Sequence, residues 1–186
     1  MNRIGLPHSF LLKARLLCYF HASGQVYFCW IPYFWSMEII RATKEHLPLV
    51  LPLFDAYRQF YEQSSDIEAS EAYLAERLAN NESALFLAYE EKGAEKIGVG
   101  FTQLYLTFSS VALKKFWVLH DLYVHEEYRK RGVAKQLISR SKELALENAP
   151  MGLVIESRIS NQSAQHLFDS VGFVTEGEHY FYFLED

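Results

Sequence analysis

The chain has 186 residues, of which 50% are apolar and 22% are charged, with 14 Phe and 12 Tyr. This length fits one domain with a proper hydrophobic core, and the composition is that of a globular chain and excludes a disordered one. The formal charge of -5 argues against a nucleic-acid groove, which normally carries a basic surplus, and is compatible with a cationic substrate.

The two cysteines, Cys18 and Cys29, form no pattern that indicates a metal or a disulfide framework. Their spacing fits no zinc motif, and two thiols are too few to staple a fold. We therefore expect no metal cofactor and a reducing, cytoplasmic setting.

Residues 1–36 differ in character from the rest of the chain and show no sustained period. Basic residues and the polar stretch 21–25 interrupt the apolar runs, so neither run approaches the roughly 18–20 apolar residues of a membrane-spanning helix. A signal-peptide core with a small-residue cleavage site is also missing. We predict that the native chain starts at Met37 and that residues 37–186 form the domain. The alternative is that residues 1–36 form a membrane-associating or oligomer-forming arm.

After this segment, hydrophobic periodicity and turn residues predict strands and helices in turn. A strand Glu38–Ala42 precedes Thr43, a helix cap, and a helix around Leu47–Tyr61, where Pro48 and Pro52 fit only the opening turn or a kink. The later elements are a helix near Ser70–Asn80, a hairpin of strands Ala84–Tyr89 and Ile97–Leu106, a strand Phe116–Val124, a helix from about Val133 to Asn148, a strand Leu153–Ser157, a helix Gln162–Ser170, and the apolar segments Phe173–Val174 and Tyr180–Leu184.

The turn between the strand at 116–124 and the next helix carries three consecutive cations, Arg129, Lys130 and Arg131. Cations are unfavourable at a helix N-terminus, where the macrodipole is positive, at up to about 1 kcal/mol each when exposed. No Ser, Thr, Asp or Asn caps this helix, so its first N–H groups lack a side-chain acceptor. A bound anion resolves both problems, because the N–H groups of residues 132–134 would donate to phosphate oxygens and the guanidinium groups would add charge.

The alternative is a solvated basic turn whose charge is neutralised by Glu126 and Glu127. The sequence has no GxxxxGK[ST] motif, and Gly98 and Gly100 lie inside a strand rather than at a strand-to-helix turn. We interpret these two glycines as packing or bulge positions. The uncapped helix start favours the anion site.

The segment DLYVHEEYRKRGVAKQL resembles the acetyl-coenzyme A (acetyl-CoA) signature of the GNAT superfamily of N-acetyltransferases. That signature is a strand followed by [RQ]-x-x-G-x-[GA], here at Arg129, Gly132 and Ala134. The later segment NQSAQHLFDSVGF resembles the family's second signature, an Asn-led helix that ends in Gly-Phe. The resemblance covers about residues 38–184, and two signatures at the right separation are specific.

The resemblance implies an α/β fold of mixed α+β type: a central twisted mixed sheet, splayed between its fourth and fifth strands, with helices on both faces. The splayed strands would be Phe116–Val124 and Leu153–Ser157, and the pantetheine arm of acetyl-CoA would pair with the backbone of Leu122 to Val124. A backbone N–H near Val124 would polarise the thioester carbonyl. Asn161 matches a cofactor-contacting Asn of relatives, or is a plain helix N-cap. The residues assigned to the cofactor are Leu122, Tyr123, Val124, Arg129, Lys130, Arg131, Gly132, Val133, Ala134, Asn161 and Phe168.

Acetyl transfer to an amine needs a base or a water chain, because an alkylammonium is protonated at pH 7. In spermidine/spermine-type relatives an acidic pair lies where this chain has His120 and Asp121, and its first position serves the amine. An imidazole, with an unperturbed pKa of about 6.5, suits the base role, although a structural role is an equal interpretation. Adjacent strand residues face opposite sides, so both cannot point at one spot. Asp121 could instead bind the substrate cation or a loop, and Glu156 on the facing strand is a third candidate.

One departure from the family pattern concerns the proton for the leaving thiolate. Many GNAT enzymes place a Tyr four residues before the Gly of the Gly-Phe pair, and this chain has Phe168 there, which cannot donate a proton. Water or another hydroxyl, such as that of Tyr123 or Tyr128, would then serve. The alternative to an enzyme is a catalytically weak acetyl-CoA-binding sensor or protein-interaction module.

The acceptor is expected to be a small amine, a polyamine or an amino acid, or else a lysine side chain, because FTQLYLTFSSV and WVLHDLYV resemble that branch of the family. Four carboxylates between the first two helices could attract a cation, although a solvated loop is an equal interpretation. We expect no nucleic-acid or membrane partner, and a homodimer through the aromatic segment Tyr180–Leu184. The four carboxylates belong to Glu62, Asp66, Glu68 and Glu71.

Overall fold

The computed structural model describes residues 15–20, 26–31, 37–149 and 151–175, and the chain divides into two compact units, 1–36 and 37–186. The first unit contains an antiparallel strand pair, β1 (Arg15–Phe20) and β2 (Val26–Ile31), where the sequence predicted no element. None of the helices in the described ranges is long and apolar enough to cross a membrane.

The second unit is built on one five-stranded sheet in the order β3-β4-β5-β6-β7. Neighbouring strands are antiparallel except β6 and β7, which are parallel, so the sheet is mixed as predicted. A parallel pair needs a crossover, and helix α3 supplies it. The strands are β3 (Met37–Arg41), β4 (Ser83–Lys92), β5 (Glu95–Ser109), β6 (Lys114–Val124) and β7 (Leu153–Ile155).

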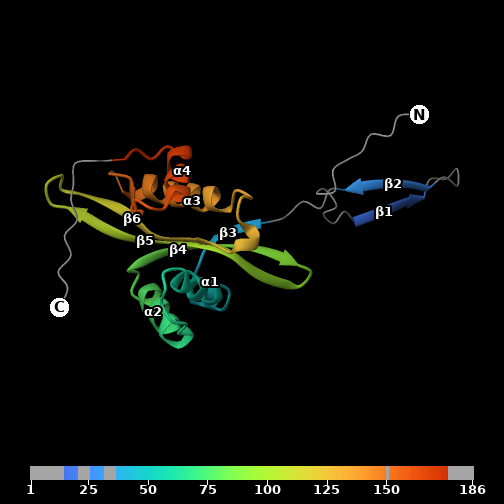
Figure 1. Ribbon diagram of the computed structural model, residues 1–186, viewed down its shortest axis with the longest axis horizontal. Helices are drawn as coiled ribbons and strands as arrows, with labels where there is room; N and C mark the ends of the chain where they lie inside the picture. The colour runs from blue at the N-terminus through green and yellow to red at the C-terminus, as the bar shows by residue number, and fades with distance from the viewer. Residues whose placement is uncertain (1–14, 21–25, 32–36, 150, 176–186) are drawn as a thin grey trace. The chain divides into compact units, whose positions relative to one another are not determined.

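The helices cover both faces of the sheet, with α1 and α2 on one face and α3 and α4 on the other (Figure 1). Thr43 precedes the short η2 as its N-cap, as predicted, and Pro48 lies in the first turn of α1. Pro52 lies inside α1 at an exposed position, beyond the opening turn. The bounds are η2 (Lys44–His46), α1 (Leu47–Phe60), α2 (Ile67–Ala79), α3 (Val133–Asn148) and α4 (Gln162–Ser170).

The two apolar segments predicted after α4 form no strand within the described residues. Phe173 and Val174 lie outside any strand, and Tyr180–Leu184 falls outside the described residues. The dimer that this segment was expected to form therefore stays a prediction.

The core lies on both faces of the two central strands. Every residue of β4 from Ser83 to Glu90 is buried, because helices pack against the strand from both sides. On the α1–α2 face, the side chains of Val50, Leu74 and Phe101 are fully buried. On the other face α3 buries an apolar stripe that includes Leu137, Ile138 and Leu144.

Two glycines of β5 allow close approach of other backbone segments. A Cβ atom on Gly98 would lie 2.4 Å from the carbonyl oxygen of Leu49 in α1, and one on Gly100 would lie 2.8 Å from the carbonyl oxygen of Tyr123. Real Cβ atoms do not approach backbone oxygens so closely, so the packing interpretation of both glycines is confirmed. The end of β6 therefore lies close against β5.

The sheet opens between β6 and β7, its fourth and fifth strands within the second unit, as predicted. The two strands pair only from Trp117 to Leu119, and β7 ends at Ile155, two residues earlier than predicted. At the same level the β5–β6 register shifts, which leaves His120 as an extra residue in β6. A bulge bends its strand, so β6 turns away from β7 at the point where their pairing ends.

Candidate functional site

A cleft of about 380 Å³ lies where β6 parts from β7. The ends of both strands, the last turn of α1 and one side of α4 line it. Nine residues that the sequence assigned to the site lie together on its wall: His120, Leu122, Tyr123, Val124, Arg129, Ala134, Glu156, Asn161 and Phe168. The other five assigned residues, all described, do not line it: Asp121, Lys130, Arg131, Gly132 and Val133.

The strand edge from Leu122 to Val124 gives the cleft a wall of backbone groups. The opposite edge of β6 pairs with β5, with Thr102 opposite Leu122 and Gly100 opposite Val124. Beyond Leu119, no strand in the described ranges pairs with the cleft-side edge. Strand backbone groups point alternately to both edges, so this edge offers hydrogen bonds to an extended ligand.

The turn after β6 has a backbone shaped for a helix start. Gly132 is the N-cap of α3 with φ 84°, and Lys130 has φ 60°, both in the left-handed region. Gly132 has no side chain with which to accept the first N–H groups of α3, and Arg129, Lys130 and Arg131 are exposed around it. The turn therefore fits a phosphate group by both its donors and its charge.

Arg129 connects this turn to the end of β6. Its Nε donates a hydrogen bond to the carbonyl oxygen of Val124 at 3.0 Å, and its guanidinium lies 5.7 Å from the ring centroid of Tyr123. Val133, by contrast, is 1% exposed and packs near Gly100. Its side chain belongs to the core, so only its backbone N–H could serve a ligand.

The bulge at His120 brings His120 and Asp121 near neighbouring tyrosines, although only His120 lines the cleft. The His120 ring lies edge-on to Tyr105, with ring centroids 5.1 Å apart, and the Asp121 carboxylate accepts a hydrogen bond from Tyr57. The charge of Asp121 also acts on the pKa of both Tyr57 and Tyr105. Both candidates therefore meet one group of tyrosines, because the extra residue breaks the strict alternation of the strand.

Burial is the largest influence on the pKa values of Asp121 and Tyr57. Burial raises the pKa of Asp121 above its ordinary value, although the hydrogen bond from Tyr57 and the charge of His120 act to lower it. Burial and then the nearby Asp121 charge raise the pKa of Tyr57, so its hydroxyl stays protonated and donates. Glu156, just past the end of β7, is exposed and lines the cleft.

Helix α4 presents one structural residue and one apolar residue to the cleft. The Asn161 side chain accepts from the N–H of Ala164 at 3.1 Å, so its role as an N-cap is confirmed, while cofactor contact stays a prediction. Phe168 is half-buried, with its ring centroid 6.0 Å from that of Phe173.

The two tyrosines suggested as proton donors to the thiolate differ in position. Tyr123 lines the cleft. Tyr128 is wrong for this role, because it is buried outside the cleft lining and its hydroxyl donates to the carboxylate of Glu90. The sequence gave no signal of which way the side chain of a tyrosine four residues past the end of β6 would turn.

Most of the predicted acidic loop belongs to the N-cap and the first turns of α2. Helix α2 begins at Ile67, three residues earlier than predicted, because the Asp66 side chain accepts from the N–H of Ala69 at 2.9 Å. Glu68 lies in the first helical turn, where the macrodipole favours a carboxylate. These contacts favour the structural interpretation for Asp66 and Glu68.

Sequence reasoning missed five aromatic and hydroxyl residues that line the cleft. Three aromatic side chains at the end of α1 and two serines near α4 line it, and Arg158 lies 5.0 Å from the ring centroid of one of them, Tyr61. Aromatic residues at helical spacing read as core, so the pattern alone could not assign them to a cleft. The five residues are Tyr57, Phe60, Tyr61, Ser157 and Ser163.

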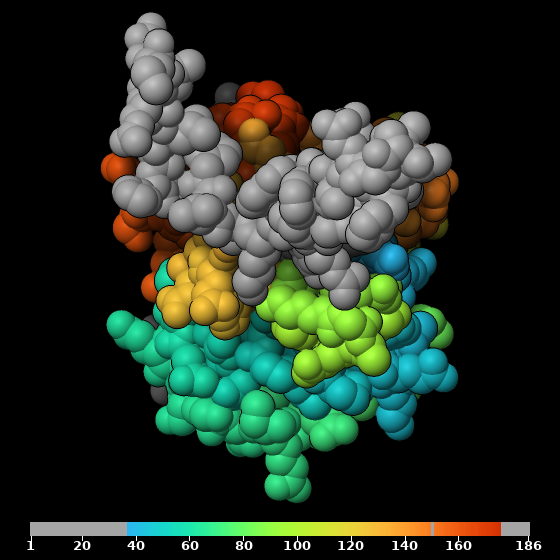
Figure 2. Space-filling view, turned by 90° about the vertical axis from the view of Figure 1, so that its right-hand side faces the viewer, coloured from blue at the N-terminus to red at the C-terminus, as the bar shows by residue number. Residues whose placement is uncertain are grey.

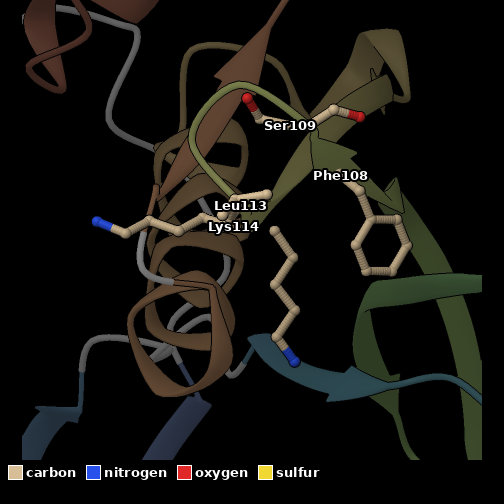
Figure 3. Close-up of a pocket in the computed structure, with 6 residues that line it drawn as sticks. Phe108, Ser109, Leu113 and Lys114 are labelled. Atoms are coloured by element: carbon tan, nitrogen blue, oxygen red, sulfur yellow. The ribbon is translucent and has the colours of Figure 1, made fainter.

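A second hollow of about 520 Å³ lies at the tip of the β5–β6 hairpin (Figure 3). Phe108 and Leu113 line it and are 71% and 88% exposed, and Lys114 lies beside them. None of the residues that the sequence assigned to the site lines it. The cleft at the opening of the sheet is therefore the candidate site.

Comparisons with known proteins give the family to which this fold belongs. The model of the acetyltransferase (GNAT) family matches residues 50–173. A Bacillus subtilis (strain 168) protein named uncharacterized N-acetyltransferase YhfO is 39% identical over 137 residues, 74% of this chain and 89% of that protein. The chain therefore belongs to the acetyltransferase (GNAT) family and is an acetyl-transferring enzyme.

Solved structures agree with this assignment. The crystal structure of a probable acetyltransferase is 38% identical, with a TM-score of 0.72, and the match covers 80% of this chain and 97% of that one. The aminoglycoside N-acetyltransferase AAC(6')-Iy, solved in complex with CoA, shares the fold at a TM-score of 0.69 and 21% identity, covering 84% of this chain and 99% of that one.

Proposed function

We propose that the protein is an N-acetyltransferase that moves an acetyl group from acetyl-CoA to a primary amine, which attacks the thioester directly in a ternary complex. The observation that carries the proposal is the cleft itself. It joins the cationic turn after β6 to His120 and Glu156 through one stretch of open strand edge. The acceptor is a small amine, a polyamine or an amino acid, or else a lysine side chain.

The donor side of the cleft fits CoA by its chemistry. Exposed cations and the first N–H groups of α3 suit the pyrophosphate, and the strand edge from Leu122 to Val124 suits the amide-bearing pantetheine arm. An N–H near Val124 would polarise the thioester carbonyl. The related AAC(6')-Iy structure holds CoA on the same fold, which supports this donor.

The acceptor side supplies the proton transfers. In the transfer the amine nitrogen forms a bond to the acetyl carbon while the carbon–sulfur bond breaks. The imidazole of His120 takes the proton that the ammonium group must lose. The thiolate gains a proton from water or from a hydroxyl on the cleft wall, such as that of Tyr61 or Ser163, and the second proton that the nitrogen loses on becoming an amide replaces it.

The lining of the acceptor side favours a cationic amine. Tyr57 and Tyr61 present aromatic rings, and Glu156 presents a carboxylate. Aromatic faces and carboxylates both attract an alkylammonium group, and each can hold it before its proton is removed.

A second candidate function is a cofactor-binding sensor or protein-interaction module with weak catalysis. Phe168 favours it, because a phenyl ring lines the cleft where many relatives place a tyrosine. Such a protein would bind acetyl-CoA and release no thiol.

An amine-panel assay separates the two functions. Release of the CoA thiol is measured with polyamines, amino acids, aminoglycosides and a lysine-rich peptide, and the acetylated product is identified by mass spectrometry. We expect amine-dependent release with at least one class. Calorimetric binding of CoA without release for any amine would instead assign the sensor function, and no CoA binding would rule out both.

A further inference from the structure

Three side chains next to the cationic turn form a compact hydrogen-bonded group, here called the Tyr128 group: Glu90, Lys92 and Tyr128. The Tyr128 hydroxyl donates to the Glu90 carboxylate, and both side chains are buried, each 6% exposed. The Lys92 ammonium lies 2.7 Å from the same carboxylate oxygen and 3.2 Å from the Tyr128 hydroxyl oxygen. Lys92 is exposed, so the buried part of the group is the pair of Tyr128 and Glu90. A charge-assisted hydrogen bond with this little solvent around it holds these two side chains in fixed positions.

The Tyr128 group connects parts of the chain that the sheet does not join directly. Glu90 and Lys92 lie at the end of β4, whereas Tyr128 lies in η3 (Glu126–Tyr128), just after β6, and β5 separates the two strands. Figure 2 shows the end of the β4–β5 hairpin and the turn on the same face of the molecule. The contact thus connects the turn to the end of the β4–β5 hairpin.

The turn needs such support before a ligand arrives. Arg129, Lys130 and Arg131 place three like charges on consecutive residues, and Lys130 adopts a left-handed φ of 60°, which costs energy for a residue with a side chain. The Arg131 guanidinium lies 5.3 Å from the ring centroid of Tyr128, so the same side chain also contacts one of the cations. Repulsion and strain both favour opening of the unliganded turn, and the buried hydroxyl contact opposes it.

The chain contains a second group of the same chemistry away from the turn. The Tyr89 hydroxyl donates to Glu38, and the Lys96 ammonium lies 3.2 Å from the Tyr89 hydroxyl oxygen. Tyr89 is 3% exposed and adjacent to Glu90 in β4, so its side chain lies on the opposite face of the sheet. It joins β3, β4 and β5 without contacting the turn, and it therefore provides a matched control.

We propose that Tyr128 is a positioning residue for the pyrophosphate of the donor: its contact with Glu90 holds the turn from His125 to Ala134 in the phosphate-binding conformation before the donor arrives. The inference rests on the proposed function, because it assumes that this turn binds CoA. A preformed site binds more tightly, since less ordering has to accompany binding.

The test compares Tyr128→Phe with Tyr89→Phe in the full chain, since each variant loses one buried hydroxyl from the same region of the sheet. Calorimetry measures the Kd for CoA. We expect Tyr128→Phe to raise it about three- to tenfold, the size of one lost hydrogen bond, and Tyr89→Phe to leave it unchanged. Acetyl-pantetheine lacks the pyrophosphate and does not need the turn, so the two variants should turn it over at the same rate as each other.

A second measurement uses the protein without ligand. Amide hydrogen exchange across residues 125–134 should be faster in Tyr128→Phe than in wild type and should not change in Tyr89→Phe. Glu90→Gln keeps the side-chain shape and weakens the acceptor, so it should show the same pattern and replaces Tyr128→Phe if that variant does not fold.

Equal CoA affinity and equal exchange in both tyrosine variants would overturn the inference. Wild-type protein that binds no CoA would instead refute the proposed function, and the exchange of the unliganded turn would still decide whether Tyr128 holds it. An equal loss of CoA affinity in both variants would show general destabilisation and would also contradict the positioning role.

Discussion

At the residue scale, His120 lies where two departures from regular sheet structure coincide. It is the extra residue of the β6 bulge, and the pairing of β6 with β7 ends at the residue before it. Its exposed ring lies on the cleft wall beside Tyr105. A residue in this place reaches a ligand in the opening without being covered by the neighbouring strand.

We expect His120→Ala to lower kcat/KM by on the order of 10²–10⁴, the usual contribution of a general base, and to flatten the acid limb of its pH profile. The measurement is thiol release against pH with the best amine. His166→Ala is the control, since His166 is exposed on α4 and does not line the cleft. A pH profile unchanged by His120→Ala would remove His120 from the mechanism.

Asp121 is expected to cost stability at neutral pH. Burial raises the pKa of Asp121 in the folded protein, so the ionised carboxylate is less favourable folded than unfolded. The cost is absent below the ordinary aspartate pKa and appears as the pH rises through the raised value. We therefore expect Asp121→Asn to raise the Tm at pH 7 while it lowers kcat/KM for the amine. A lower Tm for this variant at pH 7 would contradict the assignment.

At the element scale, a second buried aspartate, Asp55, holds the connection from α1 to α2. Its carboxylate accepts hydrogen bonds from the Gln59 side chain at 2.7 Å, the Ser65 hydroxyl at 2.8 Å and the N–H of Asp66 at 3.0 Å. Burial alone would raise the pKa of Asp55, but these hydrogen bonds and Arg58 together lower it. The connection therefore places α2 and the end of α1 that lines the cleft.

Because its pKa is lowered on folding, Asp55 contributes stability above the ordinary aspartate pKa of about 3.9, and that stability is lost as the pH falls through the lower, folded-state value. We expect Asp55→Ala to cost about 1–3 kcal/mol at pH 7, because it leaves buried donors without an acceptor. Urea unfolding at pH 7 and near pH 3 measures this. The difference in the free energy of unfolding between Asp55→Ala and wild type should be smaller at the lower pH. An equal difference at both pH values would show that the charge of Asp55 does not contribute to stability.

At the scale of the whole molecule, the sheet, the cleft and the family match all lie within residues 37–186. We expect a chain that begins at Met37 to keep the Tm and the amine-dependent thiol release of the full chain. N-terminal mass spectrometry of the native protein tests the predicted start directly. An intact Met1, or loss of activity on removal of residues 1–36, would contradict this prediction.

Between residues 37 and 170 the sequence determined the order of helices and strands, and it indicated the strand-to-helix turn as the candidate cofactor site, a role that stays a prediction. Helices α3 and α4 have their predicted bounds, and the mixed sheet opens between the predicted strands, because periodicity and the Gly132 and Asn161 helix starts are local signals. The turn from Arg129 to Ala134 was predicted because an uncapped cationic helix start is visible in the order of residues alone.

Only the tertiary structure decided which side chains meet across the cleft. A register shift between β5 and β6 leaves no mark in the sequence, yet it places the His120 ring against Tyr105, a tyrosine whose pKa the Asp121 charge also affects. The aromatic end of α1 and the buried contact from Tyr128 to Glu90 join residues far apart along the chain. Such contacts depend on how elements pack, and periodicity reports only which face of an element is apolar.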